Sequence, residues 1–113
     1  MVEAAAAAMT FVQDVDETVF LASDLIQSGV LQKLLVIGEA AGRVSSEIRA
    51  RWPDVPWRSV TGFHNITIHA YFEVDWQIVW RIATTALREL QEQLTELLRA
   101  EFPLVARQLD QRH

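Results

Sequence analysis

The chain has 113 residues, half of them hydrophobic, and a formal net charge of -5. This length suits a single domain, 1–113, with one core, and it leaves no room for a second. The acidic balance excludes a general nucleic-acid coating protein, because such a protein needs many cations to neutralise phosphates. The absence of cysteine excludes disulfides, thiolate zinc sites and a cysteine nucleophile.

The alanine-rich start of the chain is predicted to be a helix of the fold, over about residues 2–13. No basic segment precedes the alanine run Ala4 to Ala8, and Glu3 is acidic, so the segment differs from a secretion signal. Nowhere do about 20 apolar residues follow one another, so we expect no membrane span. Together with the lack of cysteine, these features favour a cytoplasmic protein.

Two further helices are expected before the first proline. Asp14 and Glu17 resemble a capping box that opens a second helix, which would end near Gln27, before the break at Ser28-Gly29. A third helix is predicted from about Val30 to Arg51. It must stop there because a proline follows shortly, and proline cannot continue the helical ladder.

The second half of the chain predicts two long helices. Asp54 is the expected N-cap of a fourth helix, over about 56–72. Asp75 is the expected cap of a fifth helix, over about 76–101, and Pro103 separates a short C-terminal segment. The periodicity is helical almost throughout. We therefore predict an all-α fold, an up-and-down bundle of about five helices.

An apolar stripe marks the fifth helix at steps of four and three residues. Its members are Trp76, Trp80, Ala83, Leu87, Leu90, Leu94 and Leu97. Such a stripe is typical of a bundle core or of a dimer interface, and it is rarely a ligand site.

A stripe of small residues in the third helix predicts a close contact with a neighbouring backbone. Its members are Gly38, Ala41, Gly42 and Ser45. A glycine inside a helix costs about 1 kcal/mol relative to alanine, so a packing reason is expected. A phosphate-binding loop is excluded, because no Gly-Lys-Ser/Thr ending follows and no strand precedes the glycines.

The fourth helix contains the chain's candidate chemistry. If the helix is ideal, one of its faces is formed by Arg58, Gly62, Asn65 and His69. Asn65 and His69 are four residues apart, so the amide can hydrogen-bond the imidazole and fix its tautomer. An imidazole can take the proton of an RNA 2′-hydroxyl or protonate the leaving 5′-oxygen, while Arg58 can hold a neighbouring phosphate. His69 is the candidate acid or base.

Structural explanations exist for the same residues. His64 and Tyr71 lie on the mostly apolar face of the ideal helix, where both are commonly core residues. His64 and His69 are five apart and lack a third ligand at metal-site spacing, so neither a metal nor a cofactor is expected. One further group can either contact phosphate or line a solvated helix face; its members are Arg43, Arg49, Arg51 and Arg58.

The end of this stretch resembles a known family. Asn65 followed by His69-Ala70-Tyr71 resembles the Arg-Asn-x-x-x-His-x-Tyr signature of HEPN-fold ribonucleases, specifically the HepT-like toxins paired with nucleotidyltransferase (MNT) antitoxins. Four more segments agree with the family in the same order: Ile-Gly-Glu-Ala at 37–40, Pro-Trp at 56–57, Val-Asp at 74–75 and Val-Trp at 79–80. The resemblance covers most of the chain and implies a HEPN-like helical bundle.

The same resemblance implies a function. The chain would be a metal-independent RNA endonuclease, the toxin of a type VII (HEPN/MNT) toxin–antitoxin system, acting as a homodimer whose two motifs share a cleft. His69, His64 and Asn65 would be catalytic, and Arg58 would bind the RNA substrate. Tyr71 would be the residue that the nucleotidyltransferase antitoxin silences by attaching AMP.

One position departs from the family pattern, since His64 stands where an arginine is usual. Arginine stays charged and offers phosphate a planar fork, whereas histidine is only partly charged at neutral pH. His64 could pair with His69, Arg58 could supply the cation, or the chain could be a catalytically weakened HEPN module that binds a nucleotidyltransferase partner or nucleotide. A purely structural helical dimer is the remaining alternative. We expect retained ribonuclease activity.

Overall fold

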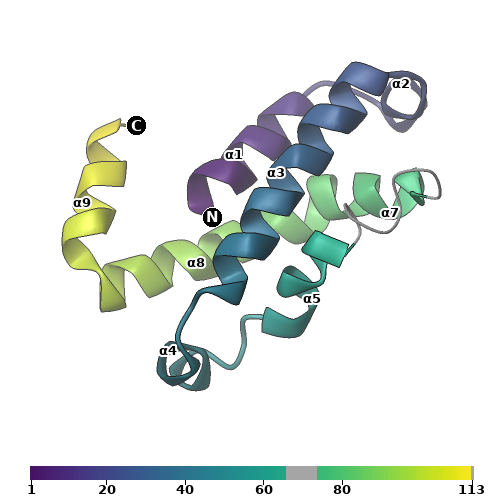
Figure 1. Ribbon diagram of the computed structural model, residues 1–113. Coiled ribbons are helices and arrows are strands. Elements are labelled where there is room, and N and C mark those ends of the chain that lie inside the picture. The colour runs from purple at the N-terminus through teal and green to yellow at the C-terminus, as the bar shows by residue number, and fades with distance from the viewer. Residues whose placement is uncertain (66–73, 113) are drawn as a thin grey trace.

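A computed structural model describes residues 1–65 and 74–112 of the chain. This part of the chain is helical and contains no strand, which confirms the predicted all-α class. The helices are α1 (Val2–Phe11), α2 (Glu17–Ala22), α3 (Asp24–Gly42), α4 (Ser46–Arg51), α5 (Trp57–Thr61), α7 (Trp76–Arg81), the π-helical η1 (Ile82–Ala86), α8 (Leu87–Glu101) and α9 (Pro103–Arg112). In Figure 1, α1 and α3 run side by side, and α9 lies at the edge of the molecule, where it packs on α8.

The alanine-rich start forms α1, as predicted. Ala4, Ala5 and Ala8 are buried, and the helix packs along α3 and against α8. Their small side chains allow the three helices to lie close together. The helix ends at Phe11, two residues earlier than expected, and the chain then turns at Asp14, whose φ is 59°. Aspartate is one of the few residues that adopt this left-handed conformation without large strain.

The boundary between the second and third helices differs from the prediction. Asp16, not Asp14, caps α2, and its carboxylate accepts the Val19 N–H at 2.8 Å. The break comes at Ser23, whose hydroxyl accepts the N–H of Ile26 and so starts α3. The expected break at Ser28-Gly29 was wrong, because both residues lie inside α3. A serine cap thus ended one helix and began the next where no glycine was needed.

The predicted single helix over 30–51 was also wrong, since α3 ends at Gly42 and a separate α4 follows. Ser45 caps α4 by accepting the Ile48 N–H at 3.2 Å. Ser45 was expected inside one long helix, but it is the N-cap of a new one. Serine favours an N-cap position over a helix interior. As expected, α4 ends before Pro53.

The fourth predicted helix is divided. Pro56, not Asp54, is the N-cap residue, and α5 ends at Thr61 with a turn at Gly62. Residues 63–65 are helical again, and the rest of the predicted span lies outside the described residues. The backbone N–H of Gly62 still bonds the Arg58 carbonyl at 3.1 Å, so the turn is tight.

The predicted fifth helix, 76–101, is confirmed as a continuous helical span made of α7, η1 and α8. Asp75 caps it, as predicted, by accepting the N–H groups of Gln77 and Ile78. The π-helical turn in its middle was not foreseen. Within it, the hydroxyls of Thr84 and Thr85 donate to carbonyls four residues earlier, a contact that bends and loosens helices.

The apolar stripe of this long helix forms part of the hydrophobic core. Its buried members are Ala83, Leu87, Leu90, Leu94 and Leu97. At its start the two tryptophans are partly exposed and pack on buried Phe20, with ring centroids 6.3 Å from Trp76 and 5.2 Å from Trp80. The sequence left open whether the stripe is a bundle core or a dimer interface; its buried residues belong to the core. Within the described ranges, no helix is long and apolar enough to cross a membrane.

Candidate functional site

The backbone of the motif segment rests directly on α3 at a glycine. A Cβ atom built at Gly38 would lie 2.7 Å from the backbone nitrogen of His64 and 3.3 Å from the Val60 carbonyl oxygen. These distances leave no room for any side chain, so the predicted close approach is confirmed at Gly38. At Gly42 nothing lies within 4 Å of such an atom, and the prediction was wrong there. The contact therefore covers only one end of the small-residue stripe.

His64 is held beside an acidic residue of α3. Its Nδ1 lies 3.8 Å from Oε1 of Glu39, the residue that follows the contact glycine. This nitrogen is buried, although 37% of the side chain is exposed. The two groups form an ion pair whenever the imidazole is protonated. The sequence placed His64 on an apolar face; the structure places it against a carboxylate.

Asn65 and Arg58 both lie on the surface near His64 in sequence, but an ideal helix does not connect them. The turn at Gly62 separates α5, which holds Arg58, from residues 63–65. Asn65 is exposed, and its N–H bonds the Gly62 carbonyl at 3.0 Å. Among the described residues, the exposed guanidinium of Arg58 has no hydrogen-bond or ion-pair partner. Both side chains are open to a ligand.

Arg49 has a structural role instead. Its guanidinium donates to the carbonyl oxygens of Ala41, at 2.6 Å, and Val44, at 3.2 Å, which lie at and just beyond the C-terminal turn of α3. It also lies over the ring of Trp57, 5.8 Å from the centroid. The Ala41 carbonyl also accepts the Val44 N–H, so Arg49 adds a second donor at the end of α3, where a cation interacts favourably with the negative end of the helix dipole. Arg49 thereby joins the end of α3 to the start of α5.

Arg51 also has a structural role. It forms two hydrogen bonds of 2.8 Å to the carboxylate of Glu101, which also accepts the indole N–H of Trp52 at 3.0 Å. The bonds from Arg51, and then that from Trp52, lower the pKa of Glu101 to about 2, and the pKa of Arg51 is raised. Of the four clustered arginines, Arg43 and Arg58 are therefore the two whose side chains remain available within the described residues.

The remaining predicted site residues lie in the segment 66–73. His69 and Tyr71 fall there, outside the described residues, so their positions relative to His64 and Asn65 stay predictions. Glu39 was not predicted to have a role. Its segment, 37–40, was noticed only as part of the family pattern, and its proximity to His64 depends on how α3 packs against a segment 25 positions later in the chain. Within the described ranges, no three His, Asp or Glu side chains gather as a metal site.

The described residues form an all-helical fold, the class that the resemblance implies, and His64 of the motif lies beside Glu39 of α3. A family model described as ribonuclease HepT-like matches residues 1–97. The chain belongs to this HepT-like ribonuclease family. The matched range ends within α8 and leaves out α9.

Individual proteins agree with the family match. A candidate RNase of Methanocaldococcus jannaschii is 30% identical over 94 residues, which cover 83% of this chain and 86% of the relative. The probable ribonuclease HepT of Thermococcus cleftensis is 30% identical over 78 residues, 69% of this chain and 71% of that protein. A candidate RNase of Caldanaerobacter subterraneus is 30% identical over 82 residues, 73% of each chain. No solved structure matches significantly.

Proposed function

We propose that the chain is a metal-independent RNA endonuclease, with His69 as its principal acid or base. The observation that carries the proposal is the match to the HepT-like ribonuclease family over residues 1–97, which includes the whole motif. In this chemistry a base takes the proton of a 2′-hydroxyl, whose oxygen attacks the phosphorus. The bond from phosphorus to the 5′-oxygen then breaks, and an acid protonates that oxygen. The products are a 2′,3′-cyclic phosphate and a free 5′-hydroxyl.

His64 takes the place of the missing arginine in this proposal. Its Nδ1 lies 3.8 Å from Oε1 of Glu39, and 37% of its side chain is exposed. Paired with His69, it would provide the second proton-transfer group or, when protonated, a cation for the phosphate. Asn65 orients His69 or contacts the scissile phosphate. Arg58 binds a neighbouring phosphate, which agrees with its exposed guanidinium, whose hydrogen bonds involve none of the described residues.

We further propose the biological setting that the motif implies. The chain acts in the cytoplasm as the toxin of a type VII (HEPN/MNT) module, as a homodimer with two motifs at one cleft. A nucleotidyltransferase antitoxin silences it by attaching AMP to Tyr71. The sequence makes this last step easy to test, because Tyr71 is the chain's one tyrosine. Coexpression with a cognate nucleotidyltransferase should add the mass of AMP to the wild-type chain but not to Tyr71→Phe.

The decisive experiment compares growth and RNA cleavage for the wild type, His69→Ala and the matched control His113→Ala. With EDTA present, we expect the purified wild type and the control to cut single-stranded RNA, and His69→Ala to lose about 100-fold or more in rate. Expression of the first two should arrest bacterial growth. If a folded wild type is inert in both assays, the alternative applies: a weakened HEPN module that binds a nucleotidyltransferase or nucleotide.

A further inference from the structure

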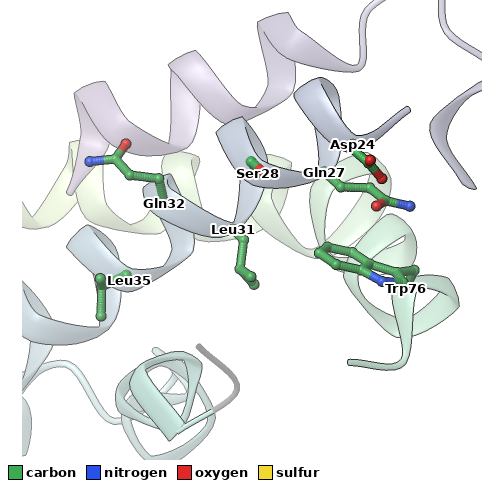
Figure 2. A pocket seen from close by; sticks show the side chains of 7 residues that line it. All are labelled: Asp24, Gln27, Ser28, Leu31, Gln32, Leu35 and Trp76. Atoms are coloured by element: carbon green, nitrogen blue, oxygen red, sulfur yellow. The ribbon is translucent and has the colours of Figure 1, made fainter. Parts of the chain in front are cut away.

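A groove outside the motif segment runs along the exposed side of α3 toward α7. Its volume is about 580 Å³, within the range of small-molecule sites. It is lined by Asp24, Gln27, Ser28, Leu31, Gln32, Leu35 and Trp76. Figure 2 shows the indole of Trp76 below the amide of Gln27, with the carboxylate of Asp24 beside that amide. The groove thus combines an aromatic ring with a row of polar groups.

Gln27 is the one buried polar side chain among the described residues, with 7% of its surface exposed. Its Nε2 donates to the Leu21 carbonyl oxygen at 3.1 Å. A carbonyl oxygen can only accept, so this contact fixes which end of the amide is nitrogen. Oε1 has no hydrogen bond to the described residues and remains a fixed acceptor at the groove. This oxygen is not one of the buried unsatisfied polar atoms of the described residues, so it is accessible from the groove.

Trp76 is a fixed aromatic surface at the other wall. It begins α7, whose first turn is capped by Asp75, and its ring packs edge to face on buried Phe20 at 72°. The side chain is only partly buried, so part of the indole is available in the groove. Ring stacking on such a residue is a common way to hold an unpaired nucleobase, and it is worth about 1–3 kcal/mol per base.

We propose that this groove binds one base of single-stranded RNA, a base that bears an exocyclic amino group, at a distance from the cleaved bond. The inference rests on the proposed ribonuclease function. The indole of Trp76 stacks on the base, and the acceptors of Gln27 and Asp24 receive its amino hydrogens. Adenine, cytosine and guanine have such an amino group, and uracil does not. The negative Asp24 disfavours a phosphate in the groove, so the neutral base enters and the backbone stays outside.

The groove is linked to the motif through α3. Gln27 and Glu39 are 12 positions apart on this helix, which corresponds to about 18 Å at 1.5 Å per residue. At the near end of the groove, Leu35 and Glu39 are neighbours on one helix face. An RNA whose cleaved bond lies at His64 can therefore reach Trp76 only with a base several nucleotides away from that bond. The groove is a specificity site rather than part of the reacting centre.

Binding is measured apart from cleavage with fluorescent 2′-O-methyl RNA oligomers, which lack the attacking hydroxyl. We expect anisotropy titrations of the full chain to give tighter binding for oligomers of A, C or G than for oligomers of U. Trp76→Leu should weaken the preferred oligomer about five-fold or more, because it removes the stacking surface. Asp24→Asn should reduce the preference over U, and Glu47→Gln, an exposed first-turn acid of α4, should not.

The results separate this inference from the proposed function. Equal affinity for all four oligomers, or affinity unchanged in both Trp76→Leu and Asp24→Asn, would overturn it. If sedimentation shows that Trp76→Leu converts a dimer to a monomer, the groove is an interface between copies, and the base site is also overturned. If circular dichroism shows that Trp76→Leu does not fold, the test rests on Asp24→Asn, a change at an exposed residue, and an unchanged preference over U in that variant overturns the inference. A wild type that binds with the expected preference but cleaves nothing contradicts only the proposed activity.

Discussion

The segments around His64 and around Arg49 both attach to α3, but by different kinds of contact. At His64 the attachment is backbone against backbone, across a glycine with no space for a methyl group. At Arg49 it consists of one guanidinium that donates to two carbonyl groups and lies over an indole ring. The first contact depends on exact fit, and the second depends on charge. The motif segment is thus set by the contact that tolerates substitution least.

The largest effect should come from Gly38, and Gly42 of the same helix provides the comparison. Gly38→Ala should lower the free energy of unfolding by about 1–3 kcal/mol, because its methyl group must displace the backbone at His64. Gly42→Ala is the matched control, and it should raise stability by about 0.5–1 kcal/mol, since its surroundings are open and alanine favours a helix. Urea unfolding measures both. Equal effects at the two positions would show that the contact at Gly38 is not tight.

Arg49→Ala should have the next largest effect. It leaves the Ala41 and Val44 carbonyls without this donor and removes the stacking on Trp57, at a cost of about 1–2 kcal/mol. Arg43→Ala, an exposed arginine beside the same helix end, should change stability little. Thermal unfolding at low and high salt distinguishes the two. An Arg49→Ala protein as stable as Arg43→Ala would contradict the capping role.

The Arg51–Glu101 pair should contribute less, and its contribution should depend on pH. Because the folded-state pKa of Glu101 is lowered from 4.5 to about 2, the pair stabilises the fold above the unfolded pKa. This stabilisation is lost as the pH falls from about 4.5 toward about 2. The melting temperatures of wild type and Glu101→Gln should therefore differ at neutral pH and converge in acid. Glu96→Gln, an exposed site on the same helix, should show no such convergence.

Glu39→Gln should change stability least of all, since half of the Glu39 side chain is exposed. If Glu39 positions His64, the variant should nevertheless cleave RNA more slowly, by a smaller factor than His69→Ala. Single-turnover experiments measure the cleavage rate, and urea unfolding measures the stability. Glu47→Gln, a matched change on α4, should leave both unchanged. Slower cleavage that tracks a loss of stability would point to a structural role only.

The sequence predicted the helical class, the long helix from Asp75 onward and the buried leucine stripe, because these follow from local periodicity and one capping residue. It failed at the ends of α3. No glycine or proline marks the start of α3 at Ser23, which caps it with its hydroxyl. At the other end, Gly42 was assigned to the small-residue stripe and the capping role of Ser45 in α4 was missed. The division of the fourth helix at Gly62 was missed because a single glycine is often tolerated within a helix.

The candidate site was partly predictable. Arg58 and Asn65 were predicted on the polar face of the helix, and both are exposed, whereas His64 was predicted on the apolar face and is partly exposed. The small residues of α3 indicated a close contact, correctly at Gly38. The position of Glu39 beside His64 could not be derived, because it depends on which turn of α3 meets the motif. The roles of Arg49 and Arg51 also depend on distant partners, which charge patterning alone does not reveal.

The π-helical turn η1 has a consequence for insertions and deletions. At its end the Leu87 N–H bonds the Ile82 carbonyl, five residues back, so the turn holds one residue more than an α-helical turn. Deleting one residue there would restore a regular α-helix and rotate everything before it by about 100° relative to α8. Trp76 and Trp80 would then turn away from Phe20 while the leucines stayed in place. The extra residue of the turn thus sets the rotation of Trp76 and Trp80 about the helix axis relative to the buried leucines. We therefore expect insertions and deletions in the turn to be tolerated less well than substitutions.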